Sequence, residues 1–411
     1  MSYNSITMRR VLFWVAALGV ISVCGAQRLV WLGNLPGGSG SEALGVSNDA
    51  VVTGTATNTD SFPRAFRWTE TSGMQDLGTL GGVLSRGTAI SADGSTIVGY
   101  SSDSNGSLVA FRWRNGQMEA LSHLSSVRWS EAYGVSADGA VVSGHSWWGS
   151  NFRVARWQVN TVVGLNAPSG AIATRGWGVS GDGQVVVGAA FYPSFGLPEA
   201  RAARWQGNAI QLLGALDGYR RSWAFAASHD GSVIVGYALA NGDNGPSTSI
   251  HWVNGQVQNL GWLPLEGADG SIAYGVSGDG AIVVGNSDGR AYRWTETRGM
   301  ENLNTVYASL LADGSQLYTA NAISANGRYI VGQGYNAAAQ RTEAFLLDTT
   351  TCAAHNGDID QNGCVDDSDL LAVLFAFGQS GEGLGRVDVN CDRTVDDADL
   401  LMVLFNFGDG C

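Results

Sequence analysis

Between residues 28 and 348, short apolar runs alternate with turn residues, and one pattern recurs seven times. In each copy a small residue and an aliphatic residue precede a serine, and a turn and an apolar run ending in glycine follow it. The seven serines are Ser47, Ser91, Ser136, Ser180, Ser228, Ser277 and Ser324. Their spacing of 44 to 49 residues is typical of a four-stranded propeller blade.

Each copy predicts four short strands. The first strand ends at the serine, and an Asp-Gly pair then suits a tight hairpin because glycine accepts positive φ. The second strand is apolar, as in Val185–Gly188, the third is of the Ala-x-Arg-Trp type, as in Ala65–Trp68, and the fourth resembles Met74–Gly78. The first copy, at Asn48-Asp49, lacks the turn glycine. We expect the third-strand tryptophans to pack between blades.

The two ends of the repeat region complement each other. No fourth strand follows Leu347, whereas a spare strand, Leu29–Gly33, precedes the first serine. The N-terminal strand is therefore predicted to complete the last blade, which removes the exposed edge of a linear array. The sequence thus predicts an all-β seven-bladed β-propeller over residues 27–350, closed by its N-terminal strand.

These units resemble the HAF-type repeats of bacterial secreted proteins. The resemblance covers about residues 28–347, and its strongest carriers are the Ala-Phe-Arg-Trp segments, such as Ala110–Trp113, and the Ser-Ala-Asp-Gly turns. It implies export and a repeated β fold, and it implies no established activity.

The C-terminal 60 residues contain two matching segments at an offset of 30, Val365–Leu371 and Val395–Leu401. Oxygen-bearing side chains stand at loop positions one, three, five, nine and twelve, and a backbone carbonyl at position seven. The first set is Asp358, Asp360, Asn362, Asp366 and Asp369 with the carbonyl of Cys364, and the second is Asp388, Asn390, Asp392, Asp396 and Asp399 with that of Thr394. Calcium takes six to eight hard oxygen ligands, so two Ca²⁺ sites are predicted.

The two loops differ at the sixth position. Gly363 suits the sharp turn of the first loop, whereas Arg393 replaces glycine in the second, so weaker binding is expected there. Clustered carboxylates repel without metal, so calcium is expected to drive folding of this region. Each loop leads into a predicted apolar helix, Leu370–Phe377 and Leu400–Phe407, and no helix is expected before either loop.

Loop-then-helix pairs with Asp at the twelfth position look like a type I dockerin over residues 351–411. The resemblance implies a small α-helical docking domain that binds a cohesin on another protein. The family's recognition pair at positions ten and eleven falls on Asp367-Ser368 and Asp397-Ala398. Cellulosomal dockerins favour hydroxyl residues there, so the expected partner is a cohesin-like protein or another cell-surface component.

Charge and cysteine also separate the two regions. The chain has a net charge of −13, and residues 352–411 hold 12 acids against 2 arginines, which argues against nucleic acid as a partner. The same region holds Cys352, Cys364, Cys391 and Cys411, an even set that indicates two disulfides in an exported module. Of the three pairings, we favour Cys352–Cys411 with Cys364–Cys391.

Residues 1–26 have the layout of a secretory signal peptide. Arg9 and Arg10 precede the apolar run Val11–Val23, and small residues follow. The run is short for a membrane span. A lipoprotein would use Cys24, although the residues before it match that signal poorly. We therefore expect a secreted protein, extracellular or at the cell surface, without a transmembrane span after processing.

Several tryptophans fall outside the repeat consensus and are expected in loops. They are Trp129, Trp147, Trp148, Trp177, Trp223 and Trp262. Exposed aromatic faces stack on sugar rings, which makes Trp147, Trp148 and Trp262 candidate glycan contacts, with ordinary packing as the alternative. The five histidines show no metal-binding spacing, and nucleophile-elbow, phosphate-loop and zinc motifs are absent from the sequence, so no catalytic residue is assigned.

The sequence thus favours a non-catalytic propeller that binds or displays. It would be attached through a calcium-dependent, dockerin-like module and would contact polysaccharide. The alternative is an extracellular polysaccharide-degrading enzyme, a glycoside hydrolase or lyase that carries a dockerin, and a third option is a structural protein of the cell surface. Two or three non-consensus acids beside exposed aromatics at one propeller face would favour the enzyme.

Overall fold

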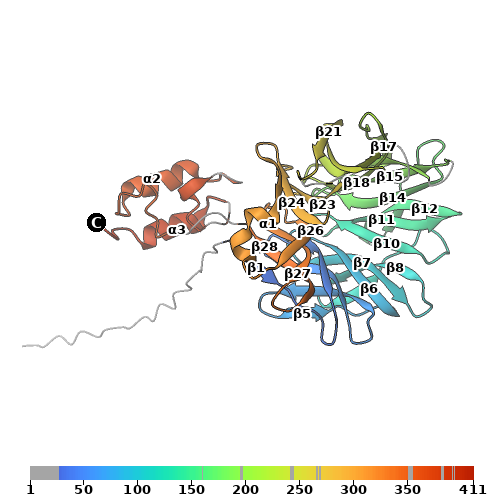
Figure 1. Cartoon of the computed structure of the whole chain (residues 1–411), viewed down its shortest axis with the longest axis horizontal. Helices are drawn as coiled ribbons and strands as arrows, with labels where there is room; N and C mark the ends of the chain where they lie inside the picture. Colours follow the sequence, from blue (N-terminus) through green and yellow to red (C-terminus); the bar gives the residue numbers. More distant parts are fainter. Residues whose placement is uncertain are drawn as a thin grey trace, which may run out of the picture. The chain divides into compact units, whose positions relative to one another are not determined.

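The computed structural model describes residues 27–159, 161–194, 198–240, 245–264, 267, 270–349, 355–380, 384–390, 392 and 394–411. The chain forms two compact units, Gln27–Thr351 and Cys352–Cys411 (Figure 1). The predicted signal peptide lies outside the described residues. Within these ranges, the structure has no helix that is long and apolar enough to cross a bilayer.

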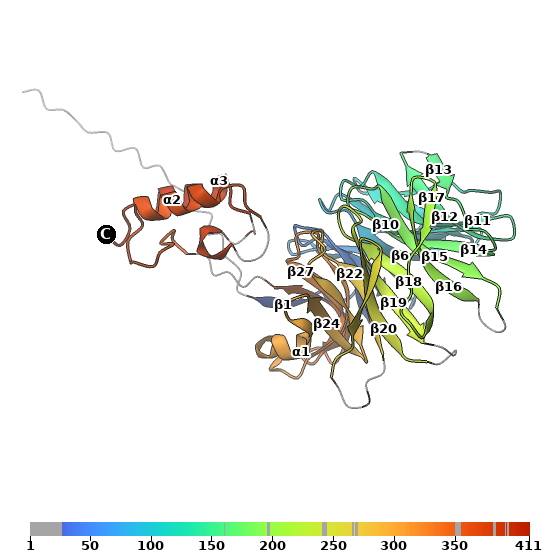
Figure 2. The same ribbon diagram turned by 90° about the horizontal axis from the view of Figure 1, so that it is seen from above.

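The larger unit is a seven-bladed β-propeller, and each blade is a four-stranded antiparallel sheet (Figures 1 and 2). Blade 1 holds β2 (Ser41–Val46), β3 (Val52–Thr57), β4 (Pro63–Thr69) and β5 (Gly73–Asp76). Blade 2 holds β6 (Gly81–Ile90), β7 (Thr96–Asp103), β8 (Leu108–Arg114) and β9 (Gln117–Ala120). Blade 3 holds β10 (Ser130–Val135), β11 (Val141–Trp148), β12 (Asn151–Gln158) and β13 (Thr161–Gly164). Blade 4 holds β14 (Ala173–Val179), β15 (Val185–Tyr192), β16 (Glu199–Gln206) and β17 (Ala209–Leu212).

The remaining blades repeat this order from the axis outward. Blade 5 holds β18 (Tyr219–Ala227), β19 (Val233–Ala240), β20 (Ser247–Val253) and β21 (Gln256–Gly261). Blade 6 holds β22 (Ser271–Val276), β23 (Val283–Ser287), β24 (Arg290–Thr295) and β25 (Gly299–Asn302). The short helices α1 (Leu303–Val306) and η1 (Ala308–Leu311) lead to blade 7, which holds β26 (Gln316–Ile323), β27 (Tyr329–Asn336) and β28 (Arg341–Asp348). The fourth strand of this last sheet is β1 (Arg28–Trp31), which pairs antiparallel with β28 from Arg28↔Asp348 to Trp31↔Phe345.

The recurring serine holds each inner turn. In blade 3, Ser136 Oγ donates to Asp138 Oδ1 at 2.6 Å and accepts from the backbone N–H of Val141 at 2.9 Å. The same two bonds recur in blade 2 and in blades 4 to 7. In blade 1, Ala50 takes φ +59° at the turn position that glycine fills elsewhere, and Ser47 Oγ accepts from Val51 N at 3.0 Å. The serine is therefore the residue that joins the turn to the start of the second strand.

The third-strand tryptophans pack between blades, as predicted. Trp205 and Trp252 are fully buried, and Trp157 is 2% exposed. Their indole N–H groups donate to backbone carbonyls outside their own strands, as Trp205 Nε1 does to Asn166 O and Trp252 Nε1 to Gly214 O, both at 2.7 Å. Burial of these large rings therefore leaves no cost from an unpaired donor.

Backbone hydrogen bonds join the blades around the axis at the end that carries the serine turns. Ala137 N donates to Gly181 O at 2.9 Å, and Gly278 N donates to Ala325 O at 2.8 Å. Equivalent bonds link the other neighbouring blades, and between blades 7 and 1 the side chain of Asn48 accepts from Asn326 N at 3.0 Å. The backbones approach closely there, since an added Cβ at Gly278 would stand 2.8 Å from Ala325 O. This end of the axis is therefore narrow.

The smaller unit holds α2 (Asp367–Ala376), α3 (Asp397–Phe405) and the 3₁₀ turn η2 (Gly385–Val387). Both α-helices begin three residues earlier than expected, because Asp366 and Asp396 form capping boxes with Asp369 and Asp399. The turn η2 precedes the second loop, where no helix was expected. A valine cluster, which includes Val365 and Val395, forms the core.

The disulfide joins Cys364 to Cys411, whose Cα atoms are 4.6 Å apart. The favoured pairing of Cys352 with Cys411 and Cys364 with Cys391 is therefore wrong. The reason is the path of the chain after α3, which returns beside the first loop: Val365 N donates to Asp409 O at 3.0 Å, and Gly408 N donates to Val365 O at 2.8 Å. Cys352 and Cys391 lie outside the described residues.

Candidate functional site

A β-bulge interrupts the innermost strand of all seven blades at one equivalent position. The bulged residue stands three before the serine, where the register between the first two strands shifts. These seven residues are Leu44, Thr88, Tyr133, Trp177, Phe225, Tyr274 and Asn321. A bulge re-aims a side chain out of the ladder. All seven line one pocket of about 510 Å³ on the propeller axis, which we call the axial pocket.

Four consecutive blades supply one wall of the axial pocket with half-buried aromatic rings. Trp177 meets Phe225 edge to face, with ring centroids 5.5 Å apart, and Phe225 stacks with Tyr274 at 5.9 Å. Tyr133 continues this wall on blade 3. The wall therefore presents aromatic faces over a contiguous part of the circumference.

The opposite wall, on blades 7, 1 and 2, is largely polar, apart from Leu44 on blade 1. Arg86 Nη2 forms an ion pair with Glu42 Oε2 at 2.9 Å, and Asn321 Nδ2 donates to Glu42 Oε1 at 3.2 Å. Thr88 Oγ1 donates to Ala132 O at 2.9 Å. An aromatic wall that faces fixed donors and acceptors suits a ligand with one apolar face and polar edges.

The floor of the axial pocket is aliphatic. Val46, Ile90 and Val135 from successive inner strands line both this pocket and a narrower space of about 140 Å³ below it. Ala92, Ala137 and Gly181, which form backbone hydrogen bonds between blades at the serine turns, also line that narrower space. Glu42 and Arg86 precede the bulges of their inner strands, on the side away from the serines, so the pocket opens at the propeller face away from the serine turns.

A hydrogen-bonded acid fixes Tyr133 in the aromatic wall. Tyr133 Oη donates to Glu131 Oε2 at 2.6 Å, Trp129 Nε1 donates to Glu131 Oε1 at 2.9 Å, and His145 Nε2 lies 3.5 Å from Glu131 Oε2. Burial opposes ionisation of Glu131, but the interactions with His145, Tyr133 and Trp129 outweigh it and lower its pKa to about 2. Burial, followed by the Glu131 charge, raises the pKa of Tyr133. Tyr133 therefore stays a neutral hydrogen-bond donor to Glu131.

The tryptophans outside the consensus differ in position. Trp147, Trp148, Trp177 and Trp223 lie in strands rather than loops, because β11, β14 and β18 extend beyond the repeated segments. Trp177 lines the axial pocket, and Trp147 stacks with Trp129 at 6.0 Å.

The three candidate glycan contacts do not form one platform. Trp147 and Trp148 are consecutive in β11, so their side chains point to opposite faces of the blade. Trp148 is 48% exposed with the Arg153 guanidinium 5.8 Å from its ring, and Trp262, 38% exposed, follows β21 of blade 5. Apart from Trp177, sequence reasoning missed the side chains that line the axial pocket. A usable signal was present, since the residue three before each serine varies while its neighbours repeat.

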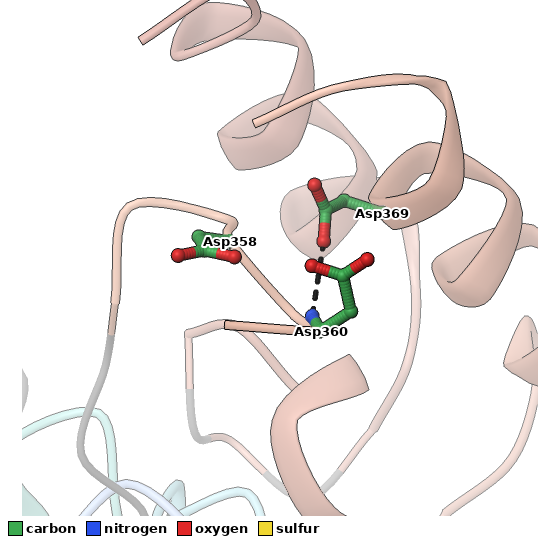
Figure 3. Close-up of side chains that lie close together, drawn as sticks. All are labelled: Asp358, Asp360 and Asp369. Atoms are coloured by element: carbon green, nitrogen blue, oxygen red, sulfur yellow. Dashed lines mark hydrogen bonds between the residues drawn. The ribbon is translucent and has the colours of Figure 1, made fainter. Parts of the chain in front are cut away.

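In the smaller unit, each predicted calcium loop brings three aspartates together. One carboxylate oxygen from each of Asp358, Asp360 and Asp369 lies within 4.8 Å of the others (Figure 3). Asp388, Asp392 and Asp399 form the equivalent cluster in the second loop. The twelfth-position residues Asp369 and Asp399 are fully buried at the starts of their helices.

Backbone donors hold Asp369 in its ionised form. Asp369 Oδ1 accepts from Ile359 N at 2.6 Å and from Asp360 N at 3.2 Å, and Oδ2 accepts from Asp366 N at 2.9 Å. Burial raises the pKa of Asp369, but these hydrogen bonds outweigh it, so its pKa lies below the usual value.

The other predicted ligands shape the loops or cap the helices. Asn362 Nδ2 donates to Asp360 Oδ2 at 3.1 Å, and Asn390 Nδ2 donates to Asp392 Oδ2 at 2.9 Å. Asp366 and Asp396 are the N-cap residues of α2 and α3. The amides of Cys364 and Thr394 donate to the fifth-position side chains of their loops, Asn362 Oδ1 and Asp392 Oδ1.

The first loop fits a hard cation. Asp358 Oδ1 is buried and, among the described residues, accepts no hydrogen bond. A buried carboxylate oxygen without a partner is costly unless a cation neutralises it. Gly363 takes φ +92° at the sixth position, as expected for the sharp turn, whereas Arg393 of the second loop lies outside the described residues.

The helices of the smaller unit expose large apolar side chains. Phe375 on α2 is 84% exposed, and Phe405 on α3 is 83% exposed. The residue pairs predicted to contact a partner, Asp367-Ser368 and Asp397-Ala398, are exposed on the first turns of the same helices. The two helices thus present similar exposed surfaces.

Comparison with known proteins supports the fold. No family model matches the chain, and no curated protein matches it. Among solved structures, an oligogalacturonate lyase from Vibrio parahaemolyticus matches with a TM-score of 0.51 and 10% identity over 79% of this chain and 94% of that one. The β-propeller domain of the Trilobed protease from Pyrococcus furiosus matches with a TM-score of 0.48 and 10% identity over 76% and 95% of the two chains. A putative TolB from Agrobacterium tumefaciens matches at 0.40 and 14% over 54% and 79%.

Proposed function

We propose that this protein is a secreted, non-catalytic propeller that binds a saccharide in its axial pocket and attaches to a partner through its calcium-dependent C-terminal unit. The observation that carries the proposal is the asymmetry of the seven bulged positions. Four adjacent bulged positions are aromatic, whereas the other three are Asn321, Leu44 and Thr88. The ion pair of Glu42 with Arg86 lies beside these three and makes this wall largely polar. A sugar ring has an apolar C–H face and hydroxyl edges, which matches this division.

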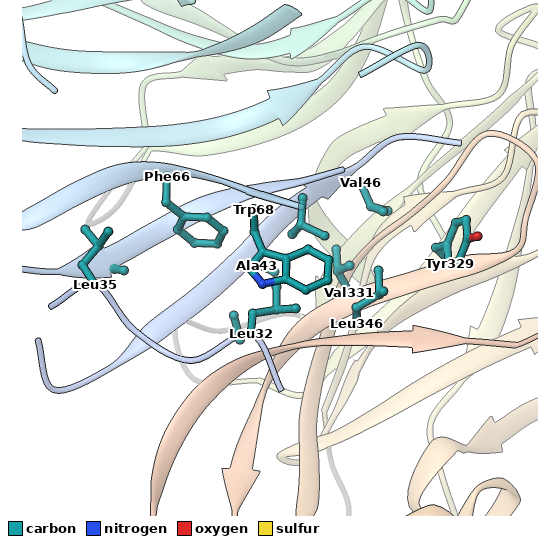
Figure 4. Packing of buried hydrophobic residues seen from close by; sticks show 12 residues of the cluster. Leu32, Leu35, Ala43, Val46, Phe66, Trp68, Tyr329, Val331 and Leu346 are labelled. Atoms are coloured by element: carbon teal, nitrogen blue, oxygen red, sulfur yellow. The ribbon is translucent and has the colours of Figure 1, made fainter. Parts of the chain in front are cut away.

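Ring closure by the N-terminal strand belongs to the same proposal, because a rigid circle fixes the seven side chains relative to one another. Its support is the pairing of β1 with β28 and a shared core at the junction of blades 7 and 1 (Figure 4). In that core Leu32 and Trp68 pack with Leu346. Ala344 N also donates to Ser41 Oγ across the junction at 2.9 Å.

The C-terminal unit would hold two calcium ions through the six clustered aspartates and the remaining loop oxygens. Bound calcium supplies positive charge that offsets the repulsion of these carboxylates, and folding of the loops depends on it in this proposal. The chain's own residues then position α2 and α3, and the exposed Phe375 and Phe405 faces would contact a cohesin-like or cell-surface partner. The leader supports secretion.

The enzyme alternative rests on the non-consensus acids near the axial pocket, Glu42 and Glu131. Glu42 forms an ion pair with Arg86 and accepts a hydrogen bond from Asn321. Glu131 accepts hydrogen bonds from Tyr133 and Trp129. Both acids therefore position neighbouring side chains, which favours binding. A polysaccharide lyase or hydrolase activity remains the alternative outcome of the test.

The test is a glycan array probed with and without calcium, followed by calorimetry and a product-release assay on each hit. Trp177→Ala in the aromatic wall and Asn321→Ala in the polar wall should each weaken binding by at least tenfold. Trp262→Ala, an exposed tryptophan outside the pocket, should leave binding unchanged. Loss of binding only in Trp262→Ala would refute the axial site, and release of shortened products would replace the binding role with an enzymatic one.

A further inference from the structure

A second pocket, of about 380 Å³, opens among blades 3, 4 and 5 and shares no lining residue with the axial pocket. Its walls include Ile172, Arg175, Phe191, Arg221, Trp223 and Leu239. These residues come from the starts of β14 and β18, the ends of β15 and β19, and the connection before β14. The pocket therefore lies toward the same propeller face as the mouth of the axial pocket.

Two aromatic rings hold the guanidinium of Arg175. Its central carbon lies 5.0 Å from the ring centroid of Phe152 and 5.7 Å from that of Phe191. Stacking on aromatic faces restricts an arginine side chain while leaving the in-plane N–H donors available. The Arg175 side chain is thus ordered in advance of any ligand, which reduces the entropy lost on binding.

Arg175 is exposed and, within the described ranges, no carboxylate pairs with it. Arg201 on the same blade gives the contrast, because it also lies over a ring, that of Tyr192 at 4.7 Å, but forms an ion pair with Glu199 at 2.8 Å. Arg175 also lines the second pocket. Its donors suit a planar, bidentate anion.

Apart from Arg221, the opposite side of the pocket is aromatic and apolar. Trp223 stacks on Tyr237 with ring centroids 4.6 Å apart and planes 6° from parallel, so the orientation of its indole is fixed. Leu239 and Ile172 add aliphatic surface. The pocket therefore combines the stacked Arg175 guanidinium with flat apolar walls.

We propose that this second pocket binds a hexuronic acid residue of an acidic polysaccharide. The sugar carboxylate would accept two hydrogen bonds from Arg175, and the C–H faces of the pyranose would contact Trp223 and Phe191. The inference deepens the proposed function by naming an acidic sugar, and it rests on the general proposal that the propeller binds saccharides. It does not rest on the axial pocket or on calcium, so the two sites can fail separately.

The test is a calorimetric titration of the full chain with a trigalacturonate and with its methyl ester, which keeps the rings but removes the charge. The acid should bind at least tenfold more tightly than the ester, and its affinity should fall as salt rises. This comparison uses the wild-type protein, so it remains decisive if a variant folds poorly. Equal affinity for acid and ester, or failure of the acid to bind, would overturn the proposal.

Two variants with the same change of charge locate the site. Arg175→Gln should weaken trigalacturonate binding by at least tenfold, and Arg201→Gln should bind like the wild type. Arg175→Lys should fall between them, because lysine keeps the charge but lacks the planar fork. Equal binding by Arg175→Gln and the wild type would contradict the assignment.

Competition separates a sugar site from a simple anion site. Acetate and inorganic phosphate at the concentration of the bound sugar should displace little trigalacturonate, and full displacement would reduce the pocket to a general anion site and refute the proposal. Trp177→Ala should leave trigalacturonate binding at the second pocket unchanged. If ligands no longer bind in the axial pocket but trigalacturonate still binds in the second pocket, only the axial site has failed.

Discussion

At the scale of single residues, the recurring serine has a role that the repeat pattern did not reveal. The sequence predicted the hairpins from the Asp-Gly pairs alone, because glycine's backbone freedom is a local property. The structure adds that Ser136 donates to Asp138 and accepts from Val141 N, so the hydroxyl closes the turn. Such a paired contact depends on side-chain geometry, which spacing alone does not give.

Ala50 stands at a backbone position that disfavours any residue with a Cβ. Its φ of +59° is the left-handed conformation that glycine adopts at equivalent turns. We expect Ala50→Gly to raise the free energy of unfolding by about 0.5–1 kcal/mol. Ala140→Gly, at an exposed position of the blade 3 turn without positive φ, should lower it. Denaturant unfolding of both variants checks this, and a destabilised Ala50→Gly protein would contradict it.

Glu131 should make stability depend on pH in the acid range. Its pKa is lowered from the usual 4.5 to about 2, so the ionised form stabilises the fold above pH 4.5, and this contribution disappears as the pH falls toward 2. Glu131→Gln should therefore cost about 2–3 kcal/mol at neutral pH and progressively less below pH 4.5.

Denaturant unfolding between pH 7 and pH 2.5 measures this difference. The exposed Glu296→Gln is the matched control and should follow the wild type. A cost of Glu131→Gln that stays constant over this range would show that the ionised carboxylate is not what stabilises the fold.

At the scale of elements, sequence periodicity predicted the kind and order of strands better than their ends. β11 extends through Trp147 and Trp148, because the hairpin of blade 3 is longer than the repeated segment. The helices of the C-terminal unit begin early because Asp366 and Asp396 cap them. The Cys364–Cys411 bond was not predictable from cysteine spacing, since it follows from how the chain after α3 lies against the first loop.

The first acidic loop gives a prediction about metal removal. Calcium at a thousandfold excess over its Kd should raise the free energy of unfolding of the C-terminal unit by about 4 kcal/mol per site. Asp358→Asn should abolish the contribution of the first loop, because it removes the charge of the carboxylate whose buried Oδ1 accepts no hydrogen bond from any described residue. Asp409→Asn, which removes the same charge outside the loops, should respond to calcium like the wild type.

Thermal unfolding followed by circular dichroism, in calcium and in excess chelator, measures this effect. A C-terminal unit that unfolds at the same temperature in both conditions would contradict the proposed metal sites.

At the scale of the whole molecule, the number of blades followed from the seven copies of the repeat, but the axial pocket could not be predicted from them. Its lining depends on a bulge in each inner strand, and a bulge is invisible to a pattern of alternating residues. The one signal of the pocket in the sequence was the position three before each serine, where the residue varies, for example as Leu44, Trp177 and Asn321. The sequence suggested glycan contacts from exposure alone, whereas the structure groups aromatic residues that are half-buried.

Removal of β1 tests closure of the ring. A chain that begins at Gly33 would leave β28 as an unpaired edge and would lose the contact of Trp31 with Phe345. We expect a fall in Tm of at least about 10 °C and a tendency to self-associate, measured by calorimetry and light scattering. A chain that lacks only Gln27 is the control. An unchanged Tm after removal of β1 would show that this strand is dispensable.

The most direct test of the central claim is a crystal structure of the protein soaked with the best neutral ligand from the glycan array. We predict electron density for a sugar ring on the axis, in contact with Trp177 and Phe225 on one side and with Asn321 on the other. Density confined to Trp148 or Trp262, with the axial pocket empty at saturating ligand, would contradict the account.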